Sequence, residues 1–315
     1  MVGRSLLDRF TEKLEFETVM PLSPYDGEVY HYSSLGNVNS ILLGKKGLCL
    51  WASRIDCLND ASEGTLPEMR FAQACDELKA DGRIDGRFYE LIRDVRPNRT
   101  GLVLYTASGK TRPVRDEFKT YVTSFSEDSD ALAMWNYYSK GSRYEGINIG
   151  ISSCRLLSSL NSRQNQHGAV MALMVKVIYD EREQLELIER VLLDLYENYE
   201  QGYENSVRYH IGTLLSNLKP VFKYACFSHE KEVRLFINVY RKFESELRIE
   251  YRTCAGYVIP YIPLNFDRSV VSRITLGPGL ESDNQKAVQK KVVEEMLMNH
   301  GYQAVVAQSI IPVRY

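Results

Sequence analysis

The stretch Phe227-Ser-His-Glu-Lys-Glu-Val-Arg-Leu-Phe-Ile-Asn-Val-Tyr240 decides the fold, because it alternates apolar and polar side chains after a short polar loop. Successive side chains of a β-strand point to opposite faces, so every second residue shares a face. This pattern predicts a strand with one apolar face packed in the core. The residues on that face are Val233, Leu235, Ile237 and Val239.

The opposite face of this strand begins with Glu230, Glu232 and Arg234. Two alternatives stay open from the sequence. In an edge strand these groups would form a solvated ladder that contributes little to stability. In a buried strand they would lie at the mouth of a cleft. There Arg234 would pair with Glu232, because a buried carboxylate is costly without a partner.

The composition is that of a folded protein: 315 residues, 44% hydrophobic, with a formal net charge of -2. A net charge so near zero does not indicate the clustered basic surface with which proteins bind duplex nucleic acid. Strand and helix patterns alternate irregularly and no internal repeat is present. We therefore expect a single α+β domain over residues 1–315 with mixed, mostly antiparallel sheets and a helical insertion at 180–219.

The six cysteines are scattered and form no C-x-x-C pair, which is typical of free thiols in a reducing cytosol. The first twenty residues lack the apolar core of a signal peptide, and no run of 18 apolar residues occurs. We expect a cytoplasmic protein with no membrane-spanning segment.

The start of the predicted insertion is acidic, with nine acids and three basic residues between Asp180 and Arg208. Leu185, Ile188, Leu192 and Leu195 recur within it at helical spacing. Its simplest interpretation is a helical hairpin with a solvated acidic face. A surface that binds a partner protein is the alternative.

Several catalytic signatures are missing, among them the dinucleotide-binding glycine fingerprint, the P-loop and the serine-hydrolase elbow. A polar loop formed by Asn59, Asp60 and Glu63 is either a turn with a helix cap or, together with Glu230 and Glu232, a Mg²⁺ site. The second alternative would make the protein a metal-dependent nuclease or phosphoesterase.

Trp135 and Tyr138 lie three residues apart on a predicted short helix and so share a face. Core packing and an aromatic wall for a flat ring are the two possible roles. His31 lies in a predicted strand, where it is either a hydrogen-bonded structural residue or part of a site.

Together these pieces resemble a bacterial family catalogued only as a domain of unknown function, number twenty-nine seventy-one. The resemblance runs from about Val29 to Pro278. The chain departs from the family at Val233, where a tryptophan is usual. The matching segments are Tyr30-His31-Tyr32-Ser33-Ser34, Leu58-Asn59-Asp60-Ala61-Ser62-Glu63, Val122-Thr123-Ser124-Phe125-Ser126, Trp135 with Tyr138, Gly146 to Gly150, Glu230-Lys231-Glu232-Val233-Arg234 and Leu276-Gly277-Pro278.

A looser resemblance connects the chain to the ADP-ribosyltransferase fold, which has an early strand histidine, a Ser/Thr-rich strand and a late Glu-x-Glu. It implies NAD as substrate, Glu232, Glu230 and His31 as catalytic residues, and ADP-ribose transfer to an unknown acceptor, in a toxin or phage-defence effector. The mid-chain aromatic spacing departs from the usual one. The resemblance further implies cofactor contacts from His31, Tyr32, Ser33, Ser124, Ser126, Trp135, Tyr138 and Arg234.

The implied chemistry needs no metal, since a fixed carboxylate can stabilise the oxocarbenium-like cation that forms as nicotinamide leaves. Arg234 would keep Glu232 ionised, and Glu230 would orient or deprotonate the acceptor. Besides the nuclease, a non-catalytic sensor that binds a nucleotide or a partner protein is the remaining alternative.

Overall fold

The computed structural model describes residues 22–58, 64–107, 110–139, 144–164, 170–198, 202–241, 244, 247–254, 256–279 and 282–313. The fold is α+β with a mixed, mostly antiparallel sheet, which confirms the predicted class. The prediction of a single domain stays a prediction. The chain divides into two compact units, of which the first comprises Met1–Ser23, Leu58–Lys119 and Val177–Phe227 and the second Pro24–Cys57, Thr120–Lys176 and Ser228–Tyr315.

The first unit is mainly helical. The predicted helical periodicity is confirmed, because Leu185, Ile188, Leu192 and Leu195 are all buried. The predicted insertion contributes two helices, which pack against two further helices of this unit rather than standing alone. These helices are α4 (Leu66–Ala80), α5 (Gly86–Ile92), α8 (Glu181–Glu197) and α9 (Glu204–Leu218).

Polar side chains fix where α8 begins. The Asp180 carboxylate accepts a hydrogen bond of 2.9 Å from the Glu183 N–H, a standard N-cap. Arg70 of α4 donates to Glu181 at 2.7 Å and to Gln184 at 3.1 Å. Strand β3 (Thr100–Ala107) pairs antiparallel with the first part of β4 (Lys110–Ser126) in the same unit.

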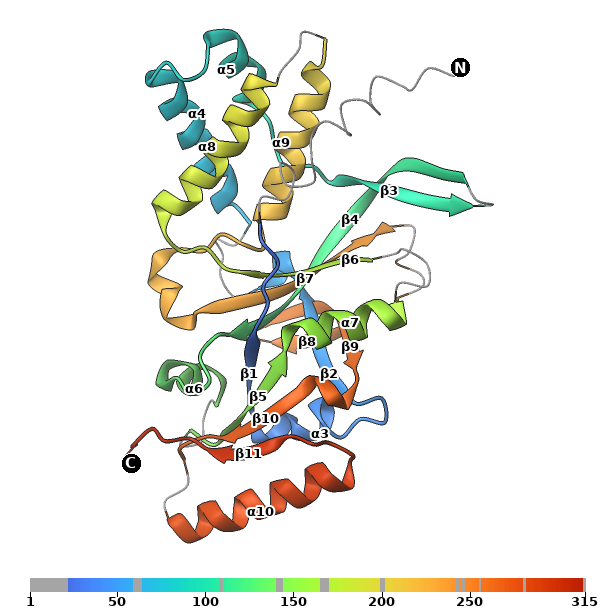
Figure 1. Cartoon of the computed structure of the whole chain (residues 1–315), viewed down its shortest axis with the longest axis vertical. Helices are drawn as coiled ribbons and strands as arrows, with labels where there is room; N and C mark the ends of the chain where they lie inside the picture. The colour runs from blue at the N-terminus through green and yellow to red at the C-terminus, as the bar shows by residue number, and fades with distance from the viewer. Residues whose placement is uncertain are drawn as a thin grey trace. The chain divides into compact units, whose positions relative to one another are not determined.

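The second unit is built on a sheet in which the strands follow the order β11-β10-β5-β1-β4-β2-β9-β8, with β7 beside β4 and β6 beside β7 (Figure 1). The pair β10–β11 is parallel, whereas β1, for example, lies antiparallel to both β4 and β5. The strands are β1 (Glu28–Ser34), β2 (Leu48–Arg54), β5 (Gly146–Ser152), β6 (Val170–Lys176), β7 (Glu232–Tyr240), β8 (Glu250–Cys254), β9 (Tyr257–Phe266), β10 (Val271–Leu276) and β11 (Val305–Gln308).

Strand β7 lies within the alternating stretch Phe227–Tyr240 and is an interior strand of the sheet. It pairs with both β4 and β6, and its predicted apolar face is at most 1% exposed. The opposite face is buried as well, with Arg234 1% and Glu232 5% exposed. The alternative of an edge strand with a solvated Glu/Arg ladder is therefore wrong.

Helices border the sheet of the second unit. Helix α6 contacts β1, α7 contacts β5 and β9, and α10 lies along β11 (Figure 1). Helix α10 begins with a capping box between Ser282 and Gln285. Helix α7 was not predicted from the sequence, because its several serines and its asparagine are weak helix formers. The helices are α3 (Val38–Ile41), α6 (Leu132–Tyr138), α7 (Ser153–Gln164) and α10 (Asp283–Asn299).

Candidate functional site

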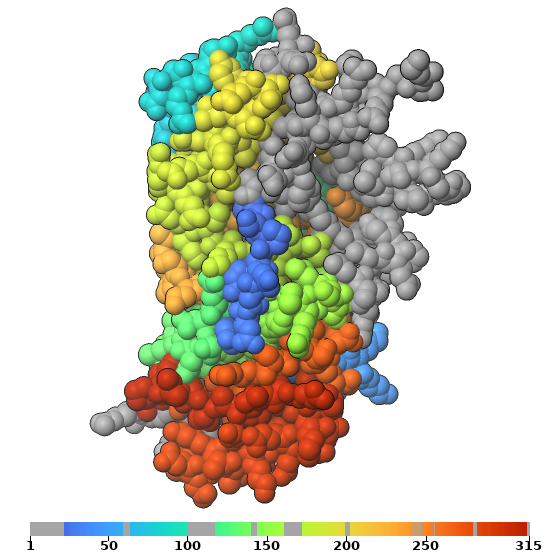
Figure 2. All heavy atoms as spheres, in the orientation of Figure 1, coloured from blue at the N-terminus to red at the C-terminus, as the bar shows by residue number. Residues whose placement is uncertain are grey.

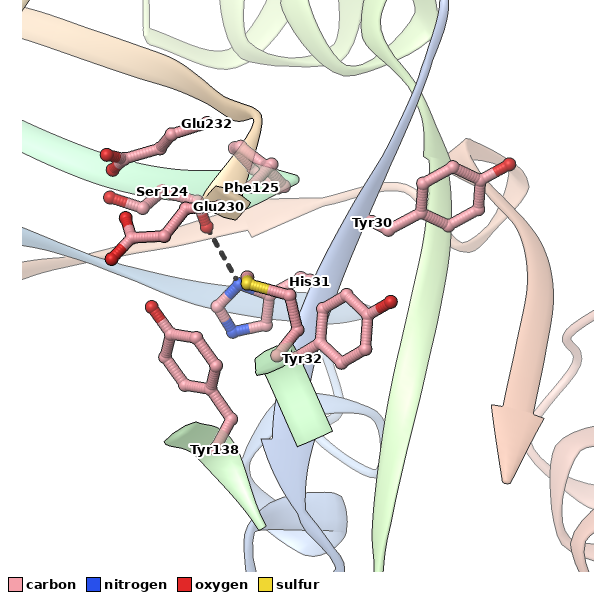
Figure 3. A pocket seen from close by; sticks show the side chains of 9 residues that line it. Tyr30, His31, Tyr32, Ser124, Phe125, Tyr138, Glu230 and Glu232 are labelled. Atoms are coloured by element: carbon pink, nitrogen blue, oxygen red, sulfur yellow. Dashed lines mark hydrogen bonds between the residues drawn. The ribbon is translucent and has the colours of Figure 1, made fainter. Parts of the chain in front are cut away.

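One pocket of the second unit brings together six of the residues that the sequence singled out. It holds about 260 Å³ of space not filled by atoms, part of which is open to solvent. Its lining residues are Tyr30, His31, Tyr32, Ser124, Phe125, Met134, Tyr138, Glu230 and Glu232 (Figure 3).

His31 comes from β1 and points into this pocket, where its ring faces Tyr138 (Figure 3). Its Nδ1 lies 3.2 Å from the Ser124 carbonyl oxygen, and its ring packs edge-on against Phe125. A carbonyl can only accept, so Nδ1 carries the proton of this bond. Burial lowers the pKa of His31, and the Ser124 carbonyl opposes that shift. In the neutral ring, Nε2 is then a hydrogen-bond acceptor for a ligand hydroxyl.

Glu232 is the first residue of β7 and is bound by Arg234, two residues along the same face. Arg234 donates from Nε to Oε1 at 2.7 Å and from a terminal nitrogen to Oε2 at 2.9 Å. Such a bidentate bond fixes the plane of the carboxylate. The Glu232 side chain also lines the pocket.

Glu230 reaches the same pocket through a sharply bent segment. Ser126 donates its hydroxyl to the Glu230 carbonyl at 2.7 Å, and the Glu127 N–H donates to the Lys231 carbonyl at 2.9 Å. Lys231 has a φ of 43°, in the left-handed region that non-glycine residues rarely adopt. The bend sets both glutamates of the Glu-Lys-Glu motif at the end of β4, where each lines the pocket.

The two aromatic candidates of α6 have different surroundings. Tyr138 is 43% exposed and lines the pocket, whereas Trp135 is 0% exposed and does not. Trp135 packs edge-on against Tyr32 with 4.8 Å between ring centroids and donates its Nε1–H to Asp130 at 2.7 Å. The Trp135 ring therefore has the core-packing role, one of the two that the sequence left open, and its implied contact with a cofactor stays a prediction.

The side-chain hydroxyls of three further candidates form hydrogen bonds with neighbouring residues. Tyr32 lines it by its ring, but its hydroxyl donates to the Asp128 carbonyl at 2.7 Å and accepts from the Ala131 N–H at 3.0 Å. Ser33 accepts from Asn37 at 3.0 Å, and Ser126 is fully buried beneath the Glu230 backbone. Neither serine is among the lining residues.

The polar loop proposed from Asn59, Asp60 and Glu63 lies outside the described residues, so the metal alternative stays a prediction. Among the residues that the structure describes, no group of three or more histidine, cysteine, aspartate or glutamate side chains is arranged to hold a metal ion. The same residues include no helix with the length and apolar character needed to cross a membrane.

Three lining residues were not predicted from the sequence. Phe125 and Tyr30 lie next to predicted site residues on β4 and β1, and Met134 lies one turn before Tyr138 on α6. The i, i+4 spacing of Met134 and Tyr138 was the available signal, because such residues share a helix face.

Neither curated proteins nor solved structures gave a match to this chain, so the resemblance to the ADP-ribosyltransferase fold stays a prediction. The family comparison gave one match, which runs from α6 into β7 and so includes Tyr138, Glu230 and Glu232. The resemblance to a domain-of-unknown-function family is thereby confirmed for part of the chain: residues 134–235 match the family described as "Protein of unknown function (DUF2971)".

Proposed function

We propose that the chain is an ADP-ribosyltransferase-like enzyme that cleaves NAD and transfers ADP-ribose to an acceptor. The observation that supports it best is the convergence of His31 and Glu232, far apart in sequence, on one pocket that also carries Tyr138. In this proposal the nicotinamide-ribose end of NAD binds at the pocket, and the diphosphate and adenosine extend from its open side.

In this proposal, His31 accepts a hydrogen bond from a ribose hydroxyl at Nε2, while Tyr138 and Phe125 flank the nicotinamide ring. The bond between the ribose C1′ and the nicotinamide nitrogen breaks, and its electron pair leaves with nicotinamide. Glu232 stabilises the positive charge that develops on the sugar. Arg234 holds Glu232 ionised for this task without itself lining the pocket.

The acceptor then forms a bond to C1′ and loses its proton to Glu230, which lines the pocket beside Glu232. Water is the simplest acceptor, so release of nicotinamide can be measured before the physiological acceptor is identified. The biological context that fits such an activity is a cytoplasmic toxin or phage-defence effector.

The test is nicotinamide release from NAD by the purified chain and by Glu232→Gln, which keeps the shape of the side chain and removes its charge. We expect the variant to lose on the order of a hundredfold or more in rate. Glu294→Gln, on the exposed face of α10, is the matched control and should match the unmodified chain. Equal rates for all three proteins, or no release by the unmodified chain, would overturn the proposal.

A further inference from the structure

Asp130 joins helix α6 to the C-terminal segment, defined here as Ser309–Val313. Its Oδ1 accepts from Trp135 Nε1 at 2.7 Å and from the Ser309 hydroxyl at 2.7 Å. Its Oδ2 accepts from the Ile310 N–H at 2.9 Å. One carboxylate thus holds a helix on one side and the end of the described chain on the other.

The C-terminal segment is itself anchored to the sheet. It follows β11, which pairs in parallel with β10, and the Ser309 N–H donates to the Leu276 carbonyl at 2.8 Å. Gln308 donates its amide to the Gly277 carbonyl at 2.7 Å. In Figure 2 the dark red end of the chain meets the green surface that includes α6. The anchor therefore extends from β10 through Asp130 to α6.

Helix α6 depends on such contacts. It has only seven residues, and Ala131 at its N-cap has no polar side chain to cap it. So short a helix is unstable in isolation, so tertiary contacts must hold it in place. Ile311 of the C-terminal segment supplies another one by packing on the cluster of Tyr32, Met134 and Trp135.

The same helix carries Met134 and Tyr138 into the candidate site. Trp135, the residue bound by Asp130, lies between them on the helix, and its fully buried ring fixes the rotation of α6. A shift of the Trp135 anchor would move both pocket residues together, because they belong to one rigid turn.

We propose that Asp130 is a positioning residue of the candidate site: by fastening α6 to the C-terminal segment, it sets where Met134 and Tyr138 stand relative to His31. The effect of Asp130 on catalysis rests on the proposed function, whereas its effect on the positions of Met134 and Tyr138 does not.

Two mild variants perturb this link from opposite sides. Asp130→Asn keeps one carbonyl oxygen for Trp135 but can place an amide N–H against the Ile310 N–H. Ser309→Ala removes the hydroxyl that reaches Oδ1 and leaves the helix untouched. Asp283→Asn is the control, since Asp283 is an exposed carboxylate at the start of α10 outside this network.

The readout independent of activity is the NMR signal of the Met134 methyl group and of the His31 ring, each assigned by substitution. Both pocket signals should shift in Asp130→Asn and Ser309→Ala and stay in place in the control. In NAD cleavage the two variants should lose about tenfold to a hundredfold in kcat/KM, the scale expected for misplaced groups.

Pocket signals that stay in place in both variants would overturn the positioning role, whatever the activity. Shifted signals together with an unmodified chain that cleaves no NAD would support the positioning role and refute the proposed function. Shifted signals with reduced kcat/KM would support both.

Discussion

Arg234 and Glu232 form a buried bidentate ion pair between two residues of one strand face, with bonds of 2.7 and 2.9 Å. Both side chains are at most 5% exposed. Their separation of two residues is the natural distance for such a pair, because residues i and i+2 of a strand point the same way. The guanidinium thereby compensates the burial of a carboxylate that lines the pocket.

Arg234→Met is expected to destabilise the chain by about 3–5 kcal/mol, because it leaves the Glu232 carboxylate buried without this partner. Urea unfolding measures the change in the free energy of unfolding. The matched control is Arg182→Met, which breaks a pair with Glu186 on α8 where both side chains are more than 60% exposed. That exposed pair should be worth less than about 1 kcal/mol. Similar losses in the two variants would contradict the buried role of Arg234.

The sequence predicted the strand at β7, because strand alternation is a local property. Whether Glu232 of this strand shares a pocket with His31 stayed open, because the two residues are far apart in sequence. The sequence also left open whether β7 was an edge or an interior strand. That depends on β4 and β6 lying on its two sides, which no local pattern of β7 encodes. The first part of β4, which is paired with β3, was not predicted.

The roles of Trp135 and Tyr138 could not be separated from the sequence either, because both aromatic rings suit a core and a binding wall. The deciding contacts come from distant segments: Tyr32 of β1 and Asp130 enclose Trp135. Which of two neighbouring aromatics faces a cavity is thus set by tertiary partners, and the helical period alone leaves it undecided.

Substitution of these two residues should separate packing from binding. Trp135→Ala is expected to cost about 3–5 kcal/mol of unfolding free energy, as for other large side chains removed from a core. Tyr138→Leu should change stability little, because its ring is 43% exposed. It should weaken nicotinamide binding by about threefold to tenfold, the value of an aromatic contact of about 0.5–1.5 kcal/mol. Thermal unfolding and calorimetric titration with nicotinamide check the two expectations, and a Tyr138→Leu protein that binds nicotinamide unchanged would contradict the second.

Stability should fall at acidic pH because of two histidines, His210 and His31. Burial lowers the pKa of His210 from 6.5 to about 4 and lowers that of His31 as well. A lowered pKa means that the unfolded chain binds the proton more readily, so stability is present above about pH 6.5 and is lost as the pH falls toward 4. Each pKa unit corresponds to about 1.4 kcal/mol, so His210 alone accounts for about 3 kcal/mol across this range.

The measurement is the free energy of unfolding in urea between pH 4.5 and 7.5. His210→Gln should flatten the pH dependence, because glutamine does not titrate. His31→Gln should flatten it as well, since the pKa of His31 is lowered by the same cause. A slope that both variants leave intact would show that other groups govern acid stability.

The left-handed backbone of Lys231 stores strain next to both glutamates of the site. Its φ of 43° costs a non-glycine residue about 1–2 kcal/mol. Glycine adopts this conformation freely. Its greater freedom in the unfolded chain, however, lowers the free energy of unfolding by about 0.5–1 kcal/mol. Lys231→Gly should therefore be about 0.5–1 kcal/mol more stable than Lys231→Ala. The alanine variant is the proper reference, because it also lacks the exposed ion pair that Lys231 forms with Asp128 at 3.1 Å.

Lys231→Val adds the opposite perturbation, since a β-branched residue is a pronounced outlier in this region. It should be less stable than Lys231→Ala and, by straightening the bend, should displace Glu230 and Glu232 from the pocket. Nicotinamide release should then be retained in Lys231→Gly and reduced in Lys231→Val, with urea unfolding at pH 7.5 confirming that both remain folded. Equal stability of the glycine and valine variants would contradict the strain, because strain at position 231 must depend on the side chain that replaces lysine.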